Sequence, residues 1–278
     1  MHLSTHNWMR PEPLETTLAR IQRLGYESIE IADPCCYDRL ETEALLEHYG
    51  IRCWGGVTLM LGERSLIARD SARRANSVQY VKEIVQRISE LGGEIVTVVP
   101  ATVNKIVPES TPENEWTWAR DSLQEVNDLA RRVGVRLAIE PLNRFENYFI
   151  NRVDQALAMA EAVGPNCGVC LDTFHLNIEE TNLLEAICLG GSKIYDFHVA
   201  DNNRLAPGQG ALDWPAIVQT LVSVGYDGGL AAEFLVPMDR TPVNRYCHEV
   251  DSDGFILMKE DFYTRLAEKT AETLLPLI

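Results

Sequence analysis

Four side chains able to bind a metal ion stand at the ends of four successive apolar segments in the second half of the sequence. They are Glu140, Asp172, His198 and Glu233. Three carboxylates that meet without a cation raise one another's pKa and destabilise the fold. A shared divalent cation removes that repulsion, and three oxygens with one imidazole suit Mn²⁺ first, with Mg²⁺ or Co²⁺ as alternatives. The residue types therefore predict a metal site if the fold brings them together.

Each of these residues alone has a simpler explanation. A single acid at the end of an apolar run is more often a helix cap or an ion-pair partner, and a single His is more often only packed and hydrogen-bonded. The joint pattern is different, because a metal-competent residue recurs at the same point of four successive units. We therefore favour metal binding for the set.

The elements that must position these residues are visible as an alternation of apolar runs and amphipathic stretches. The strand-like runs lie at 1–6, 28–33, 52–59, 94–101, 136–142, 168–174, 194–200 and 229–235. The helix-like stretches include 13–24, 72–91, 116–133, 152–162, 215–224 and 259–275. Several of the helices are expected to end at a left-handed glycine directly before the next strand: Gly25, Gly50, Gly134 and Gly225.

This alternation is a βα repeat, which implies a parallel sheet with right-handed crossovers. Eight units in about 250 residues is the size of a (β/α)8 TIM barrel. We therefore predict a single barrel domain over residues 1–278. An open doubly wound sheet is the alternative, but no Gly-x-Gly-x-x-Gly turn follows the first strand. In a barrel the C-terminal strand ends open on one face, where the four residues can converge.

Composition and charge narrow the range of partners. A formal net charge of -16 argues against nucleic acid or an anionic membrane surface, because Lys and Arg drive such binding. No apolar run approaches the roughly 20 residues of a membrane helix, and the first residues do not resemble a signal peptide. The 7 cysteines, an odd and scattered number, suit a reducing compartment. We expect a soluble cytoplasmic protein.

Further candidates lie near the predicted strands. His6 and Trp8 follow the first strand and could line the same mouth, and Trp54 could supply an apolar floor on which a sugar ring stacks. The Cys-x-x-Cys spacing of Cys167 and Cys170 has no second pair to accompany it, so packing is the better explanation.

The segments that carry the four residues resemble a known family. They read EPLNRFE, LDTFHLNIEET, FHVADNNRLAPGQGALDW and GYDGGLAAEF. These segments resemble the metal-site segments of the xylose-isomerase-like sugar isomerase/epimerase superfamily, and most of all the ketose 3-epimerases of D-tagatose, D-psicose and L-ribulose. The resemblance implies a TIM barrel, a sugar substrate, a divalent metal and proton abstraction beside a sugar carbonyl through a metal-stabilised enediolate.

The resemblance also implies a role for individual residues. Glu140 and Glu233 would be metal ligands that double as acid and base, whereas Asp172 and His198 would only bind the metal. Three further matching positions would hold the hydroxyl and carbonyl oxygens of the substrate: Glu146, His175 and Arg204.

Two departures from the family keep other outcomes open. Where the epimerases tend to have an acidic residue shortly after the metal-binding His, this chain reads ADNNR, and the segment VPMDRTPVNRYCHEVDSDG is unfamiliar. The catalytic subunit of C-glycoside deglycosidases, a lyase that works with a second small subunit, is therefore an alternative. An aldose–ketose isomerase and a non-catalytic sugar-binding barrel are others. A homo-oligomer is plausible, and Arg204, Arg240 and Arg245 leave phosphorylated sugars possible.

Overall fold

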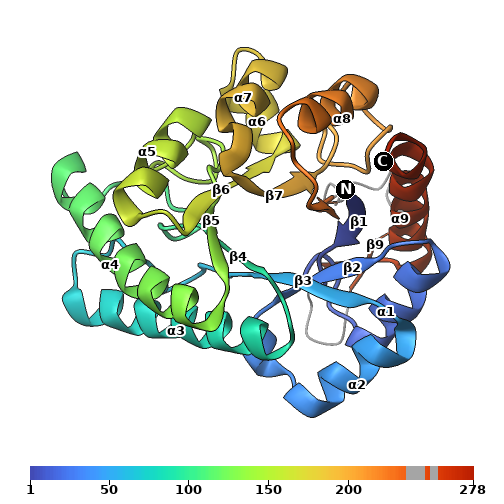
Figure 1. The fold of residues 1–278 in the computed structure, drawn as a ribbon, viewed down its shortest axis with the longest axis horizontal. Helices are drawn as coiled ribbons and strands as arrows, with labels where there is room; N and C mark the ends of the chain where they lie inside the picture. Colours follow the sequence, from blue (N-terminus) through green and yellow to red (C-terminus); the bar gives the residue numbers. More distant parts are fainter. Residues whose placement is uncertain (236–247, 251–255) are drawn as a thin grey trace.

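Eight parallel strands form the centre of the molecule. The computed structural model describes residues 1–235, 248–250 and 256–278. The strands are β1 (His2–Thr5), β2 (Ser28–Ala32), β3 (Arg52–Val57), β4 (Ile95–Val98), β5 (Arg136–Ile139), β6 (Cys167–Asp172), β7 (Ile194–Val199) and β8 (Gly229–Ala232). Their order in the sheet is β1-β8-β7-β6-β5-β4-β3-β2, and Figure 1 shows them as a ring with the helices outside. The expected (β/α)8 TIM barrel is confirmed.

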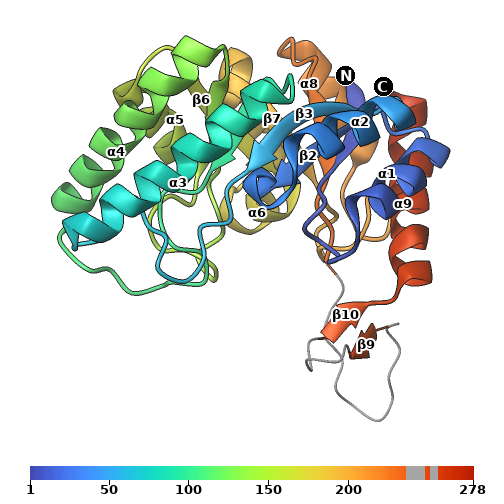
Figure 2. The same ribbon diagram turned by 90° about the horizontal axis from the view of Figure 1, so that it is seen from below.

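Helices connect successive strands along the outside of this ring. They are α1 (Leu14–Arg23), α2 (Arg39–Tyr49), α3 (Ser71–Glu90), α4 (Pro112–Val133), α5 (Val153–Val163), α6 (Thr173–Glu179), α7 (Leu183–Gly190), α8 (Trp214–Ser223) and α9 (Glu260–Leu274). Two short strands after the barrel, β9 (His248–Val250) and β10 (Ile256–Met258), pair antiparallel. Figure 2 shows this pair standing away from the barrel.

The helix ends follow from local sequence. Helix α4 begins after Thr111, whose hydroxyl accepts a hydrogen bond from the backbone N–H of Asn114, and Pro112 occupies its first position. Both features are common at helix starts, because the first N–H groups have no partner within the helix. The helix ends at Gly134, with φ of 79°, and the three other predicted glycines also have positive φ. The prediction of left-handed glycines is therefore confirmed.

The barrel closes unevenly. β1 and β2 stand at the two ends of the strand order, and an isolated parallel bridge between His6 and Glu30 joins them. We call this junction the seam. The pairing of β2 with β3 also shifts register between Ile29 and Glu30, so that Trp54 has no partner on β2. Such irregularities re-aim side chains and are frequent beside active sites.

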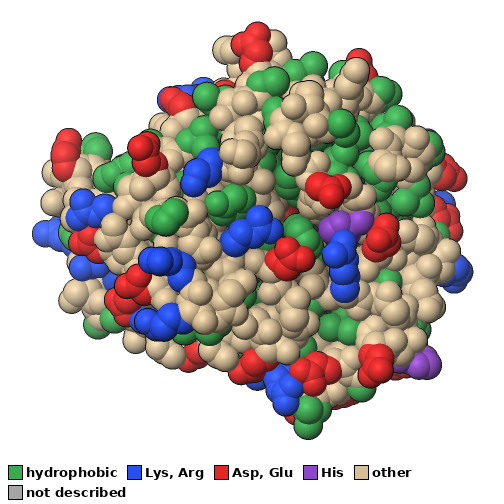
Figure 3. Space-filling view, viewed as in Figure 1, with side chains coloured by type: hydrophobic (Ala, Val, Ile, Leu, Met, Phe, Trp, Pro, Cys, Tyr) green, Lys and Arg blue, Asp and Glu red, His purple; other side chains and the backbone are tan. Residues whose placement is uncertain are grey.

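Two features of the described residues concern membrane spans and surface charge. No described helix is long and apolar enough to span a bilayer. On the face seen in Figure 3, Lys and Arg side chains are interspersed with Asp and Glu. They do not gather there into one basic patch of the kind that binds a phosphate backbone.

Candidate active site

The four predicted ligands meet at the C-terminal ends of β5 to β8. Glu140, Asp172, His198 and Glu233 each place one ligand atom so that all lie within 4.8 Å of one another. His198 is central: its Nδ1 lies 3.2 Å from Oε1 of Glu140 and 3.3 Å from Oε2 of Glu233. All four residues are buried. Residues separated by more than 90 positions thus form one compact cluster.

The backbone explains why two of the carboxylates reach this point. The N–H of Glu140 donates to the carbonyl of Val98, and the N–H of Glu233 donates to the carbonyl of Val199. Both glutamates therefore continue the ladder of parallel hydrogen bonds just beyond the ends of β5 and β8. Their side chains are held at the rim of a rigid sheet, which positions groups better than a loop does.

Asp172 reaches the cluster by a different local arrangement. It is the last residue of β6 and the N-cap of α6, and its Oδ1 accepts a hydrogen bond from the backbone N–H of Phe174. The other oxygen, Oδ2, is left to face the cluster. A helix cap is thus one of its roles, as expected for an isolated acid, and the helix start fixes the direction of the second oxygen.

The donor atoms fit a divalent cation. Within the described part of the chain, the four buried atoms that face one another in this cluster have no hydrogen-bond partner: Oε1 of Glu140, Oδ2 of Asp172, Nδ1 of His198 and Oε2 of Glu233. Buried polar atoms without partners are costly, and buried charges persist when they are paired or coordinate a metal. A set of three oxygens and one nitrogen, aimed at a common point, meets that requirement.

The pKa shifts within the cluster also favour a bound cation. Burial and then the charge of Glu233 raise the pKa of Asp172 well above its ordinary value. Burial likewise raises the pKa of Glu140. Burial also acts to raise the pKa of Glu233, but His198 and Arg204 outweigh it and lower that pKa well below its usual range. Without a cation, the cluster can be charged only in part.

Arg204 and His175 lie directly beside these ligands. Arg204 places Nη1 3.6 Å from Oδ2 of Asp172 and Nη2 3.7 Å from Oε2 of Glu233. Its backbone has a φ of 59°, which is uncommon outside glycine and asparagine. Nε2 of His175 lies 3.2 Å from the same Nη1. Arg204 thus offers hydrogen-bond donors at the edge of the metal cluster, with the imidazole of His175 beside it.

Asn143 is a site residue that the sequence analysis missed. Its backbone N–H donates to Nδ1 of His175 at 3.2 Å. Its side-chain amide lies 2.8 Å from Oε1 of Glu146. Asn143 therefore connects two of the predicted substrate-binding residues. Its place within EPLNRFE, three residues after Glu140, was the available signal.

A cavity of about 580 Å³ opens onto this cluster. The two acid/base candidates line it together with the predicted substrate-binding residues Glu146, His175 and Arg204. The rest of the wall is largely apolar and comes from other loops: Trp8, Val57, Leu59, Met60, Leu61, Val99, Val103, Leu142 and Leu235. The cavity is large enough for a sugar, and a mostly apolar wall with a few convergent polar groups is typical of small-molecule sites.

The remaining sequence candidates lie in different places. Trp8 lines the cavity as expected. His6 is fully buried beside His198, with ring centroids 4.5 Å apart, and is not among the residues that line the cavity. Arg240 and Arg245 lie outside the described residues.

The position of Trp54 differs from the expectation of a stacking floor at the mouth. It lies in the N-terminal half of β3 and lines a separate pocket with Arg52 and Arg136, the first residues of β3 and β5. That pocket is at the opposite end of the barrel. The Nε1–H of Trp54 donates to Oδ1 of Asp196 at 3.1 Å, inside the barrel. A strand position two residues from the start cannot reach the C-terminal rim.

Comparison with known proteins agrees with this geometry. The family model described as "Xylose isomerase-like TIM barrel" matches residues 18–242. A D-psicose 3-epimerase of Ruminiclostridium cellulolyticum is 31% identical over 81% of this chain and 79% of its own length. An L-ribulose 3-epimerase of Mesorhizobium japonicum is 31% identical, with coverage of 79% and 75%. Both relatives are sugar epimerases.

Solved structures share the same fold. The crystal structure of a D-psicose 3-epimerase from Clostridium cellulolyticum with D-tagatose has a TM-score of 0.87. The alignment covers 100% of this chain and 99% of the chain in that structure, with 23% sequence identity. The two relatives at 31% identity confirm the expectation of an enzyme of the isomerase and epimerase class. The chain belongs to the xylose isomerase-like TIM barrel family.

Proposed function

We propose that the protein is a metal-dependent ketose 3-epimerase that acts on a free sugar. The observation that carries this proposal is the joint placement of Glu140 and Glu233. Both line the cavity, and they come from β5 and β8, which are separated in the sheet by β6 and β7. Two carboxylates that approach one cavity from separate strands can reach a substrate carbon from two sides.

The reaction class follows from what these two side chains can do. One glutamate accepts the proton from the carbon beside the ketone, and the other returns a proton to the opposite face, which inverts that carbon. Because an epimerase runs in both directions, each glutamate serves as base in one direction and as acid in the other. A bound divalent cation would supply positive charge that stabilises the oxyanion developing on the substrate.

The neighbouring side chains are suited to hold the substrate. The guanidinium of Arg204 is a donor that can take up the hydroxyl and carbonyl oxygens of a sugar, and His175 lines the same cavity beside it. Glu146, fixed by the amide of Asn143, is an acceptor for a hydroxyl. The apolar wall on the other side excludes water, which strengthens the polar contacts.

We further propose that Glu140, Asp172, His198 and Glu233 hold Mn²⁺ in the active protein. Mg²⁺ and Co²⁺ also accept ligand sets of carboxylate and imidazole. Support comes from the four buried, unpartnered donor atoms that face one another. Removing the metal with a chelator is expected to abolish activity, and adding Mn²⁺ is expected to restore it.

Exchange with solvent deuterium tests the proposed reaction directly. Mn²⁺-loaded protein is incubated in deuterated water with free ketohexoses, aldoses and 3-oxo-glycosides, and the products are analysed by NMR. Deuterium at C3 of a ketohexose, with its C3 epimer as product, is the expected result. Glu233→Gln serves as the control, because it retains the cavity but loses one proton acceptor. Deuterium at C1 or C2 of an aldose, or release of an aglycone from a 3-oxo-glycoside, would contradict the assignment.

A further inference from the structure

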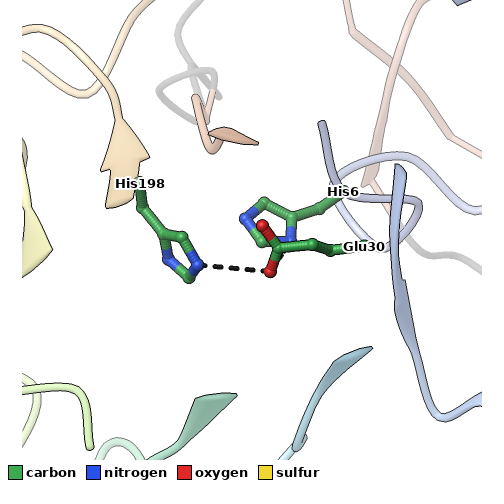
Figure 4. A group of neighbouring side chains, drawn as sticks. All are labelled: His6, Glu30 and His198. Atoms are coloured by element: carbon green, nitrogen blue, oxygen red, sulfur yellow. Dashed lines mark ion pairs between the residues drawn. The ribbon is translucent and has the colours of Figure 1, made fainter. Parts of the chain in front are cut away.

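The second ring nitrogen of His198 faces a group of buried side chains that the proposed reaction does not use. While Nδ1 faces Glu140 and Glu233, Nε2 lies 3.4 Å from Oε2 of Glu30 and 3.3 Å from Oδ2 of Asp196. Figure 4 shows the carboxylate of Glu30 beside the imidazole of His6 and turned toward Nε2 of His198. His198 therefore lies between two sets of acidic groups, one toward the cavity and one away from it.

The two carboxylates behind His198 differ in what else they bind. Asp196 already accepts three hydrogen bonds, from Nε1 of Trp54 at 3.1 Å, from Oγ1 of Thr97 at 2.9 Å and from the N–H of Phe197 at 3.0 Å. These bonds satisfy it without His198.

Glu30 is 1% exposed, and neither of its oxygens has a hydrogen-bond partner among the described residues; the same is true of Nε2 of His198, which faces it at 3.4 Å. Glu30 therefore has acceptor capacity to spare, and Asp196 has little.

The backbone aims Glu30 at His198. The register of β2 against β3 shifts directly before Glu30, and the seam bridge pairs Glu30 with His6. His6 stands edge to face against His198, with ring planes 80° apart, and its Nδ1 lies 3.8 Å from Oε2 of Glu30. His6 thus closes the remaining side of the Glu30 carboxylate.

We propose that Glu30, backed by His6, is a positioning residue for the metal site: it accepts the Nε2–H of His198 and so presents the Nδ1 lone pair to the cation. A neutral imidazole has one N–H and one lone pair, so fixing the proton on Nε2 leaves Nδ1 free to ligate. An acceptor behind a ligating histidine also sets its ring orientation and raises its basicity. The inference rests on the proposed metal site.

A second cation at His6, Glu30 and His198 explains the same contacts less well, although one ligand atom of each lies within 4.8 Å of the others. His198 would then have to give a lone pair from both nitrogens, which requires removal of its last ring proton. Without His198, only two ligands would remain. A hydrogen bond from Nε2 to Glu30 keeps that ring proton and requires no second cation.

Three variants and one control test the proposal by Mn²⁺ affinity, measured by isothermal titration calorimetry on protein stripped of metal. Glu30→Met keeps the length of the side chain and removes the acceptor, and its dissociation constant is expected to rise about 10- to 100-fold. Glu30→Gln keeps an acceptor oxygen and is expected to bind within about fivefold of wild type. His6→Phe keeps a ring of similar shape and is expected to lie between them.

Ser28→Ala is the matched control, because Ser28 is a buried residue of the same strand whose hydroxyl has no partner among the described residues. It is expected to leave the affinity for Mn²⁺ unchanged. Thermal melting of the metal-free proteins shows whether each variant folds. The EPR spectrum of bound Mn²⁺ is expected to change in Glu30→Met and to return toward wild type in Glu30→Gln.

The outcomes separate this inference from the proposed function. Equal affinity of wild type and a folded Glu30→Met would overturn the positioning role and leave the four-ligand site intact. Two bound Mn²⁺ per wild-type chain would also overturn it, in favour of a second site. No Mn²⁺ binding by wild type would contradict the metal site itself. If Glu30→Met does not fold, the other two variants still test the proposal. Wild-type Mn²⁺ affinity in His6→Phe would overturn the part assigned to His6. Mn²⁺ binding by Glu30→Gln more than 100-fold weaker than wild type would contradict the claim that an acceptor oxygen at position 30 is what matters.

Discussion

The two halves of the barrel share one backbone pattern and contribute differently to the cavity. Strands β5 to β8 each deliver a metal-competent side chain at or near the C-terminal end. Strands β1 to β4 and their loops deliver most of the apolar wall, including Trp8, Val57, Leu59 and Met60. In a symmetric scaffold, one side of a site can thus carry the reactive side chains while the other side determines the shape of the cavity.

This division has a physical advantage. Four ligands on neighbouring strands are held by continuous parallel pairing from β5 to β8, so their mutual distances depend on one rigid segment of sheet. The wall facing them carries no charge that must be balanced, and its residues can change size without altering the ligand set. Substitutions in the two halves are therefore expected to affect different kinetic constants.

The largest expected effect comes from the second half. Glu233→Gln is expected to lower kcat about 10³-fold, because it removes a proton acceptor and a ligand at once. Circular dichroism and thermal melting are expected to show a retained fold. Glu27→Gln makes the same chemical change at an exposed position in the first half. It is the control and is expected to leave kcat unchanged. Activity near wild type in Glu233→Gln would refute its catalytic role.

A smaller loss is expected when the charge beside the ligands is kept and its geometry is altered. Arg204→Lys retains a cation but cannot reach Asp172 and Glu233 with separate nitrogens, as Nη1 and Nη2 do. We expect kcat/KM to fall about 100-fold through misplacement of the substrate. Steady-state kinetics at saturating Mn²⁺ measures kcat/KM of the variant. A fall of less than threefold would show that a positive charge at position 204 is enough to place the substrate.

The first half is expected to respond mainly in KM. Leu59 lines the cavity and is only partly buried, so Leu59→Ala should cost little stability. Its KM for the sugar is expected to rise about tenfold, with kcat within about threefold of wild type, because the lost contact is made equally in ground and transition states. A fall in kcat as large as that of Arg204→Lys would break the proposed division between the halves.

The smallest kinetic effect is expected at the far end of the barrel. Trp54→Phe removes the hydrogen bond to buried Asp196 and is expected to lower the free energy of unfolding by about 1–3 kcal/mol. Urea unfolding of the metal-free protein measures this loss. The KM for the sugar is expected to remain within about twofold of wild type. A several-fold change in KM would mean that Trp54 influences the cavity from a distance.

Much of the fold could be predicted because its signals are local. Strand-length apolar runs, amphipathic stretches and terminal glycines such as Gly134 depend on neighbouring residues, and each corresponds to an element of the structure. The convergence of the four ligand candidates followed from one topological rule, that parallel strand ends share a face. The sequence therefore predicted the barrel and the grouping of these residues.

The remainder depends on long-range geometry that no short segment encodes. Trp54 was misplaced because an aromatic residue in an apolar run does not reveal which end of the barrel it faces. Glu30 was missed because its local sequence is unremarkable, and only the folded chain brings it next to His198. Asn143 lies in a segment that the sequence singled out, but its role depends on contacts with His175 and Glu146 that only the folded chain makes. Buried polar groups of this kind become recognisable when their partners are known.

The seam between β1 and β2 has a consequence for how the barrel opens. One isolated bridge and the hydrogen bond from the N–H of Glu27 to the carbonyl of Leu3 join this junction, in contrast to the longer ladder between β6 and β7, so its amide hydrogens are expected to exchange with solvent faster. The side chains at that bridge reach His198. Occupancy of the cavity is therefore expected to slow deuterium uptake at residues 2–6 and 28–32. Hydrogen exchange at the seam would then report on binding at the metal cluster.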